Sequence, residues 1–138
     1  MALRKAHARW EGGIRNRKDQ VDFGNGAFKS VYTFNSRFED GKGTNPEELL
    51  GAAHASCFAI VLGGAESKPD YVDATPQVTI LPQDGGFGST KSHLVCEAAA
   101  PVIDVATFAR HSEAAKAGCP GSQALARTTI ILDANLLR

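Results

Sequence analysis

The stretch GTNPEELLGAAHASCFAIVLGGAE, residues 43–66, begins with residues that start helices and then becomes apolar. Thr44 or Asn45 can cap a helix here, because short polar side chains accept hydrogen bonds from the first free amides. Pro46 suits the first helical position, and the two glutamates that follow it suit the positive end of the helix dipole. We therefore predict a helix that begins at Pro46.

The body of this helix is apolar nearly all round. Leu, Ala, Phe, Ile and Val fill most positions from 49 to 62, and Gly63 and Gly64 then weaken or end the helix. A helix without a polar face is typical of a central, buried position. Cys57 lies in its middle, and His54 precedes it by three residues on nearly the same face.

Short strand patterns and turn residues surround this helix. We predict strands at 2–10, 20–24, 29–34, 71–83, 86–101 and 127–137, a polar loop at 35–44, and helices at 104–118, capped by Asp104, and 120–126. The order βββ-α-ββ-α-α-β does not alternate strands strictly with helices, so it predicts an α+β fold with mostly antiparallel sheets. The 138 residues are enough for a single domain, residues 1–138.

Composition narrows the class of protein. Hydrophobic residues make up 43% of the chain, and 15 basic residues balance 15 acidic ones. A net charge of zero does not favour binding to nucleic acid or to an anionic membrane. No apolar run approaches the ~20 residues that span a bilayer, and the first ten residues lack the apolar core of a signal peptide. We therefore expect a cytoplasmic protein.

The three cysteines need another explanation than structural disulfides, which are rare in the reducing cytoplasm. Redox chemistry, a metal site and simple core packing are the alternatives. Cys57 could be a packed core residue. The nearby His54 favours a functional role instead, because an ionisable side chain on an apolar face needs a partner. Cys96 shares its face of a predicted strand with apolar residues, so we predict a core position for it.

Cys119 immediately precedes Pro120 and therefore lies at the start of the short helix 120–126. The positive end of a helix dipole favours a thiolate, so local electrostatics alone predict that Cys119 is the more reactive sulfur. The alternative is a cysteine that simply occupies a helix–helix turn.

A metal site is the weaker alternative. His54, Cys57 and Cys119 could be ligands of zinc, but structural zinc sites use four ligands, usually in closely spaced pairs. The chain contains no CxxC motif, and the spacing of its other three histidines does not suggest a set of metal ligands. We predict no metal and no cofactor.

Arg37 lies between Phe34 and Phe38, which suggests that this loop packs inward and carries the charge with it. A buried guanidinium keeps its proton and must therefore find an anion. A thiolate or Glu47 would serve.

Two motifs together resemble the OsmC/Ohr family of osmotically inducible and organic hydroperoxide resistance proteins. They are RFEDGKGTNPEELLGAAHASCF and AGCPGSQALA, in a chain whose first strand ends in Trp10. The motif HASCF, with its histidine before the cysteine, resembles the version found in the OsmC branch of the family. The resemblance implies an intertwined homodimer with two sites at the subunit interface. It also implies a thiol-dependent peroxidase that reduces organic hydroperoxides in oxidative or osmotic stress defence.

The resemblance also implies residue roles. Cys57 would be the peroxidatic cysteine and Cys119 the resolving cysteine, which overrules the local prediction that Cys119 attacks first. Arg37 and Glu47 would support the reactive thiolate. The partners would be an organic hydroperoxide and a dithiol reductant such as a lipoyl-bearing protein. Gly121 departs from the motif, where a larger apolar residue is expected.

Spacing adds one constraint. Glu47 and Cys57 are ten residues apart, which is roughly 15 Å along one helix, too far for a glutamate side chain. If Glu47 supports Cys57, one of the groups comes from the other subunit. Two rival functions remain open: a non-enzymatic dimer that binds an apolar ligand, and a small metal-binding protein.

Overall fold

The computed structural model describes residues 2–14, 18–65, 68–126 and 128–138. The chain forms two compact units, residues 1–49 and residues 50–138. The assignment of residues 1–138 to one domain stays a prediction.

The first unit contains an antiparallel sheet in the order β1-β2-β3, built from β1 (Ala6–Arg9), β2 (Lys18–Phe23) and β3 (Lys29–Thr33). A glycine-containing turn joins β2 to β3, and Gly26 adopts a φ of 78° there. Positive φ is strained for residues with a Cβ, so a glycine suits this turn. Strands β2 and β3 pair antiparallel and form a hairpin.

Helix α1 (Phe34–Phe38) corrects the prediction of a loop at 35–44 and of a strand that included Phe34. Thr33 caps the helix: its Oγ1 accepts the Ser36 N–H at 2.9 Å, and Ser36 Oγ accepts the Thr33 N–H at 2.7 Å. This reciprocal capping box satisfies two amides that a loop would leave to water. The observed order is therefore βββ-αα-ββ-αα-β.

Helix α2 (Pro46–Gly64) begins where the sequence predicted. Asn45 is its cap, because Asn45 Oδ1 accepts the Glu48 N–H at 2.8 Å. The helix buries one face, which carries Gly51, His54, Ala55, Phe58 and Leu62. Other apolar side chains of α2 are exposed, and Ile60 reaches 75% exposure. Within the second unit, therefore, only one face of α2 is covered, which differs from the expected central, buried position.

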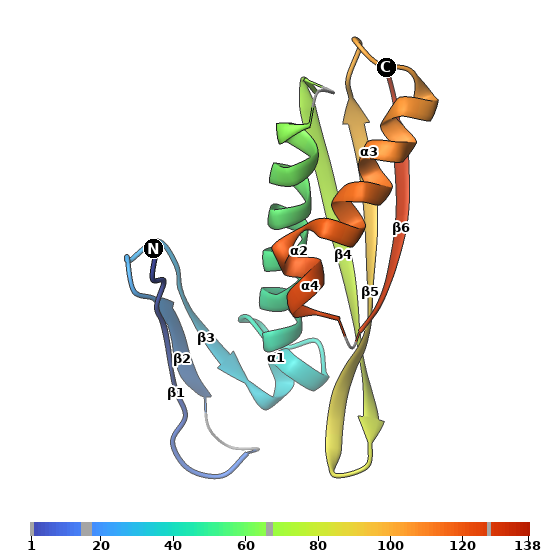
Figure 1. The fold of residues 1–138 in the computed structure, drawn as a ribbon. Helices are drawn as coiled ribbons and strands as arrows, with labels where there is room; N and C mark the ends of the chain where they lie inside the picture. Colours follow the sequence, from blue (N-terminus) through green and yellow to red (C-terminus); the bar gives the residue numbers. More distant parts are fainter. Residues whose placement is uncertain (1, 15–17, 66–67, 127) are drawn as a thin grey trace. The chain divides into compact units, whose positions relative to one another are not determined.

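The second unit contains a sheet in the order β4-β5-β6, and its three strands run side by side in Figure 1. β4 (Tyr71–Gln83) pairs antiparallel with β5 (Gly86–Ala99), whereas β6 (Thr129–Leu136) pairs parallel with β5. A parallel pair needs a long crossover connection, and α3 (Val105–Gly118) and α4 (Pro120–Ala124) lie in it. The predicted start of β6 at Arg127 lies outside the described residues.

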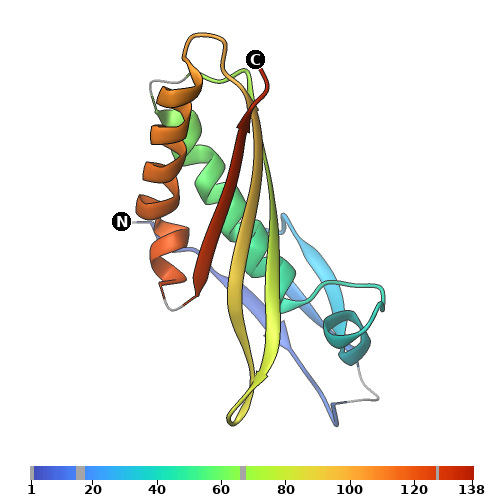
Figure 2. The ribbon, with the colours of Figure 1, turned by 90° about the vertical axis from the view of Figure 1, so that its right-hand side faces the viewer.

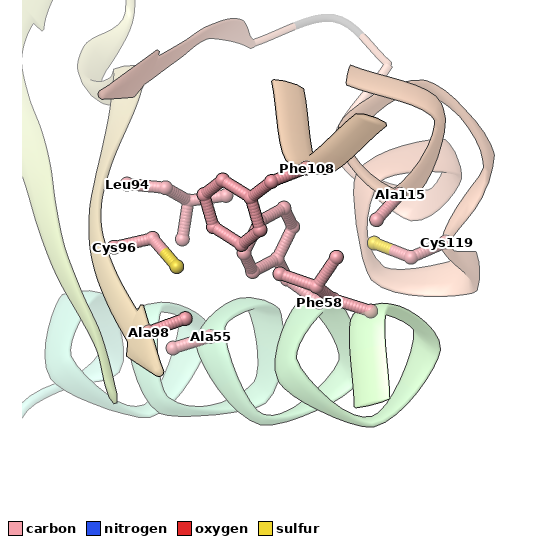
Figure 3. Packing of buried hydrophobic residues seen from close by; sticks show 9 residues of the cluster. Ala55, Phe58, Leu94, Cys96, Ala98, Phe108, Ala115 and Cys119 are labelled. Atoms are coloured by element: carbon pink, nitrogen blue, oxygen red, sulfur yellow. The ribbon is translucent and has the colours of Figure 1, made fainter. Parts of the chain in front are cut away.

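Helices α2 and α3 lie against one face of this sheet (Figures 1 and 2). The core cluster combines Phe58 of α2, Leu94 and Cys96 of β5, and Phe108 of α3 with further buried residues of the same elements and with Cys119 (Figure 3). Cys96 is fully buried, as predicted. Burial raises the pKa of its thiol to about 11, and the carboxylates of Asp73 and Glu97 add to the shift. Cys96 is therefore a neutral packing residue at neutral pH.

Candidate functional site

Cys57 lies on α2, half-buried, and packs against the edge of the core. Its sulfur accepts a hydrogen bond from the backbone N–H of Gly121 at 3.4 Å. A backbone donor favours the negative form of an acceptor. The helix therefore presents a sulfur that is both accessible and contacted by a fixed donor.

Cys119 is fully buried and lies between two helices, where it ends α3 and caps α4. Its sulfur accepts the N–H of Ser122 at 3.3 Å. Both sulfurs thus contact consecutive amides of α4, those of residues 121 and 122. The structure brings the two cysteines of the sequence prediction to the same turn, and both are free thiols.

Gly121 allows this approach of α4 to α2. A Cβ at Gly121 would lie 3.3 Å from Cys57 Cβ and 3.4 Å from His54 Cα. A contact of 3.3 Å is tight, so Cys57 Cβ or α4 would have to give by a few tenths of an ångström. The sequence departure at Gly121 therefore coincides with a tight contact between α4 and α2 beside Cys57 and His54.

His54 is fully buried and bridges two serines, a connection that was not predicted from the sequence. Its Nδ1 lies 2.9 Å from Ser92 Oγ on β5, and its Nε2 lies 2.8 Å from Ser122 Oγ on α4. Ser122 Oγ in turn lies 3.0 Å from Cys119 Sγ. Burial lowers the pKa of His54 below its ordinary value, so the imidazole is neutral at neutral pH. The only sequence signal was that His54 and Ser122 each lie three residues from a cysteine.

Arg37 and Glu47 form an ion pair within the first unit. Arg37 Nη2 lies 3.0 Å from Glu47 Oε1, and Arg37 Nε contacts the same carboxylate at 3.3 and 3.4 Å. The glutamate side chain is 9% exposed and the arginine 38%. The guanidinium also lies 5.1 Å from the centre of the Phe38 ring. Of the two anions predicted for Arg37, the structure pairs it with Glu47.

A pocket of about 350 Å³ lies beside this arginine within the first unit. Aromatic side chains dominate its lining, and Trp10 and Tyr32 contact each other at 5.3 Å between ring centres. Phe34 and Phe38 form a second pair at 5.0 Å. The pocket therefore combines apolar walls with one cationic group, Arg37.

Within the described part of the chain, no group of three or more His, Cys, Asp or Glu side chains is arranged to hold a metal ion. Two histidines contact carboxylates rather than a set of metal ligands: His7 lies 3.3 Å from Asp22, and His93 lies 2.6 Å from Asp133. The same residues contain no helix that is long and apolar enough to span a membrane.

Comparisons with known proteins agree with the motifs. A family model described as OsmC-like protein matches residues 39–133. Peroxiredoxin OsmC of Escherichia coli (strain K12) is 46% identical to this chain, and the match covers 96% of each chain. The chain therefore belongs to the OsmC family. Arg37 lies just before the residues that the family model matches.

Solved structures share the fold. The organic hydroperoxide resistance protein OhrB of Bacillus subtilis superposes with a TM-score of 0.76 at 25% identity, covering 96% of this chain and 98% of that chain. An OsmC-like protein of unknown function from Vibrio cholerae gives a TM-score of 0.77 at 15% identity, covering 97% and 99%. These likenesses confirm the predicted OsmC/Ohr-like α+β fold.

Proposed function

We propose that the protein is a thiol-dependent peroxidase that reduces organic hydroperoxides to alcohols in oxidative or osmotic stress defence. The observation that carries the proposal is the pair of free thiols, Cys57 and Cys119, whose sulfurs contact consecutive amides of α4. The relative named Peroxiredoxin OsmC and the structural neighbour named for organic hydroperoxide resistance support the same reaction class.

The reaction has three steps. The Cys57 thiolate attacks the distal oxygen of the hydroperoxide, the O–O bond breaks, and the alkoxide leaves as an alcohol after it takes a proton. Cys57 is then a sulfenic acid. The Cys119 thiol condenses with it to a disulfide and releases water. An external dithiol, such as a lipoyl-bearing protein, reduces the disulfide and returns both thiols.

The ion pair and the aromatic pocket have roles in this proposal. Arg37 would stabilise the Cys57 thiolate, because a fixed cation favours the charged form of a thiol. Glu47 would hold the guanidinium in place through its close contacts. The aromatic lining beside Arg37 would favour a fatty or aryl hydroperoxide over hydrogen peroxide.

Intact-mass analysis before and after one equivalent of cumene hydroperoxide tests the function. A loss of two hydrogens indicates the disulfide, and a gain of one oxygen indicates an unresolved sulfenic acid. Turnover with a dithiol should be faster with cumene hydroperoxide than with hydrogen peroxide. No mass change and no turnover would refute the proposal.

Cysteine variants assign the roles. Cys57→Ser should abolish peroxide consumption. Cys119→Ser should permit one turnover and then leave Cys57 open to overoxidation. Cys96→Ser is the matched control, because Cys96 is a core residue and the two α4 amides contact the other two sulfurs, so this variant should retain activity.

Arg37 variants test the ion pair. Arg37→Ala should lower the rate at neutral pH and shift its pH dependence upward, and Arg37→Lys should rescue it only partly, since an ammonium does not reproduce the forked guanidinium. The rate of alkylation by iodoacetamide against pH is the measurement. An unchanged profile in Arg37→Ala would mean that Arg37 is only a surface residue.

A second candidate function is a non-enzymatic dimer that binds an apolar ligand. The aromatic pocket of the first unit is the observation in its favour. The two candidates differ in the peroxidase assay with a reducing thiol: the ligand-binding protein consumes no hydroperoxide.

A further inference from the structure

A chain of hydrogen bonds joins three elements of the second unit and ends at the second cysteine. It runs from Ser92 on β5 to His54 on α2, from His54 to Ser122 on α4, and from Ser122 Oγ to Cys119 Sγ, with distances of 2.9, 2.8 and 3.0 Å. His54, Ser92 and Cys119 are fully buried, and Ser122 is 5% exposed. No step of the three-step reaction above uses this chain.

Packing alone does not account for the chain. An imidazole and two hydroxyls lose their hydration when they are buried, whereas apolar side chains of similar size would fill the space without that loss. All three groups are placed so that each has a hydrogen-bond partner, and the chain ends at a sulfur that the proposed reaction must deprotonate.

The donors and acceptors of these side chains can be arranged so that each hydrogen bond points from the Cys119 sulfur toward His54. With Nδ1 protonated, the imidazole donates to Ser92 Oγ and its Nε2 accepts the Ser122 hydroxyl proton. Ser122 Oγ can then accept the Cys119 S–H. The lone pair of Nε2 thus lies at the end of a two-step path from the Cys119 thiol.

We propose that His54 accepts the Cys119 proton through the Ser122 hydroxyl while Cys119 attacks Cys57. In this step the Cys119 proton moves to Ser122 Oγ, and the Ser122 proton moves to Nε2. The new S–S bond forms as the S–O bond of the Cys57 sulfenic acid breaks. The hydroxide that leaves takes the proton from the imidazolium and becomes water. This step rests on the proposed function, because it requires oxidised Cys57.

The surroundings of His54 suit a proton acceptor. Burial lowers the pKa of its ring, so the acceptor form is present at neutral pH. The groups that its ring nitrogens face are the hydroxyls of β5 and α4, with the Cys119 thiol beyond Ser122. Cys57 lies one turn further along the same helix.

A test that needs no peroxide separates this inference from the proposed function. Dithiodipyridine oxidises Cys57 to a mixed disulfide and releases one thiopyridone at a rate that depends on its concentration. Cys119 then displaces the second thiopyridone at a rate that does not. This second phase, followed by absorbance, reports the attack of Cys119 directly.

In the wild type the second phase should be nearly independent of pH between about 6.5 and 8.5, because His54 takes the proton. His54→Gln keeps a hydrogen-bonding side chain but cannot accept the proton. Its second phase should be roughly 100-fold slower at pH ~7 and should rise with pH. Ser122→Ala should behave alike, and Ser122→Thr should restore the hydroxyl and most of the rate. The first phase should be unchanged in every variant.

His111→Gln is the matched control, because the described residues offer no hydrogen-bond partner to its buried Nδ1 and it lies on α3. It should keep the wild-type profile in both phases. A second phase that stays fast and independent of pH in both His54→Gln and Ser122→Ala would overturn the inference. Equal slowing of both phases would overturn it too, because it would indicate a general structural role.

The two hypotheses fail separately. If the wild type reacts with cumene hydroperoxide but the variants keep the flat second phase, only the role of His54 is wrong. If the wild type consumes no hydroperoxide yet its second phase depends on His54 as described, the peroxidase function is wrong and the proton path stands.

Discussion

Gly121 lies where α4 approaches α2, and it offers a test of the geometry at the two sulfurs. A Cβ there would lie 3.3 Å from Cys57 Cβ and 3.6 Å from His54 Cδ2. Gly121→Ala should therefore displace α4 by a few tenths of an ångström, lower the free energy of unfolding by up to about 1 kcal/mol, and slow the formation of the Cys57–Cys119 disulfide. Urea unfolding and the mass assay after one equivalent of cumene hydroperoxide measure the two effects.

Gly118→Ala is the control for this change. A Cβ at Gly118 would meet no atom within 4 Å, so the variant should gain up to about 1 kcal/mol from its lower chain entropy. Its disulfide formation should match the wild type. If both variants behaved alike, the short contacts at Gly121 would have no consequence for the site.

Cys96 predicts how stability depends on alkaline pH. Its pKa is raised from 9.0 to about 11 in the folded protein. A folded pKa above the unfolded one means that the native state holds the proton more tightly, so its stabilising effect is complete below pH ~9 and is lost as the pH rises toward ~11. The loss amounts to at most about 3 kcal/mol.

Cys96→Ala removes this group, so urea unfolding of the reduced protein at pH ~8.5 and ~10.5 should show a smaller loss of stability in the variant than in the wild type. The comparison cancels the other groups that titrate in this range. An equal loss in both proteins would contradict the assignment of Cys96 as a neutral, buried thiol.

For single residues, the sequence predicted where a side chain lies in its own helix or strand better than it predicted which distant side chains contact it. The core position of Cys96 and the position of Cys119 at the start of a short helix follow from local patterns, and both are confirmed. The partners of His54 do not, because Ser92 and Ser122 lie 38 and 68 residues away from it. Only the packing of β5 and α4 on α2 brings those hydroxyls to the ring.

Two glycines of helix α2 differ in their surroundings: close packing requires a glycine at position 51 but not at position 63. Gly51 lies in its buried face, and a Cβ there would lie 3.0 Å from Pro76 Cγ and 3.3 Å from Val78 Cγ2 on β4. Gly63, near the end of the same helix, would meet nothing within 4 Å. Helix α2 continues through Gly51 without a break.

Gly51→Ala should cost about 1–3 kcal/mol, because the proline ring cannot move aside easily and α2 must shift from β4. Gly63→Ala should gain up to about 1 kcal/mol from helix propensity. Thermal or urea unfolding of the two single variants provides the comparison. A stabilising Gly51→Ala would show that α2 is not held this close to β4.

Most helices and strands could be predicted from the sequence, and the missed helix α1 has a local cause. Strand β4 spans Tyr71–Gln83 as predicted, because alternating residues end at clear turn signals. Helix α1 was missed because its capping box uses Ser36, whereas a glutamate or glutamine is the usual third residue. The exposed side of α2 was also unpredictable, since an apolar sequence does not say whether its own chain covers it.

That exposed side leads to a prediction about the whole molecule. Ile60 is 75% exposed, and Leu50 and Val61 are exposed at 38% and 37%. Apolar side chains grouped on one helix suit an interface with a second copy of the chain. We expect a homodimer in sedimentation equilibrium at micromolar concentration and expect Ile60→Asp to shift it toward monomers. Val105→Asp, which changes a residue 69% exposed on α3, is the control and should leave the dimer intact.

The subunits should also share their sites. Glu47 and Cys57 are separated by ten positions of the continuous helix α2, or roughly 15 Å along its axis. A glutamate does not reach that far, and Arg37 is paired with Glu47. If the ion pair supports the peroxidatic thiolate, we expect it to come from the partner subunit.

Mixed dimers test this arrangement. One chain carries Cys57→Ser and the other carries Arg37→Ala with Glu47→Ala. When all three groups act within one chain, neither site of the mixed dimer is intact and activity stays absent. When the ion pair acts across the interface, one site lacks every group and the other is complete, so about half of the wild-type activity returns, as expected for independent sites. Each parent homodimer, assayed alone, is the control and should be nearly inactive. A wild-type protein that is monomeric at micromolar concentration would contradict the shared site before any mixing.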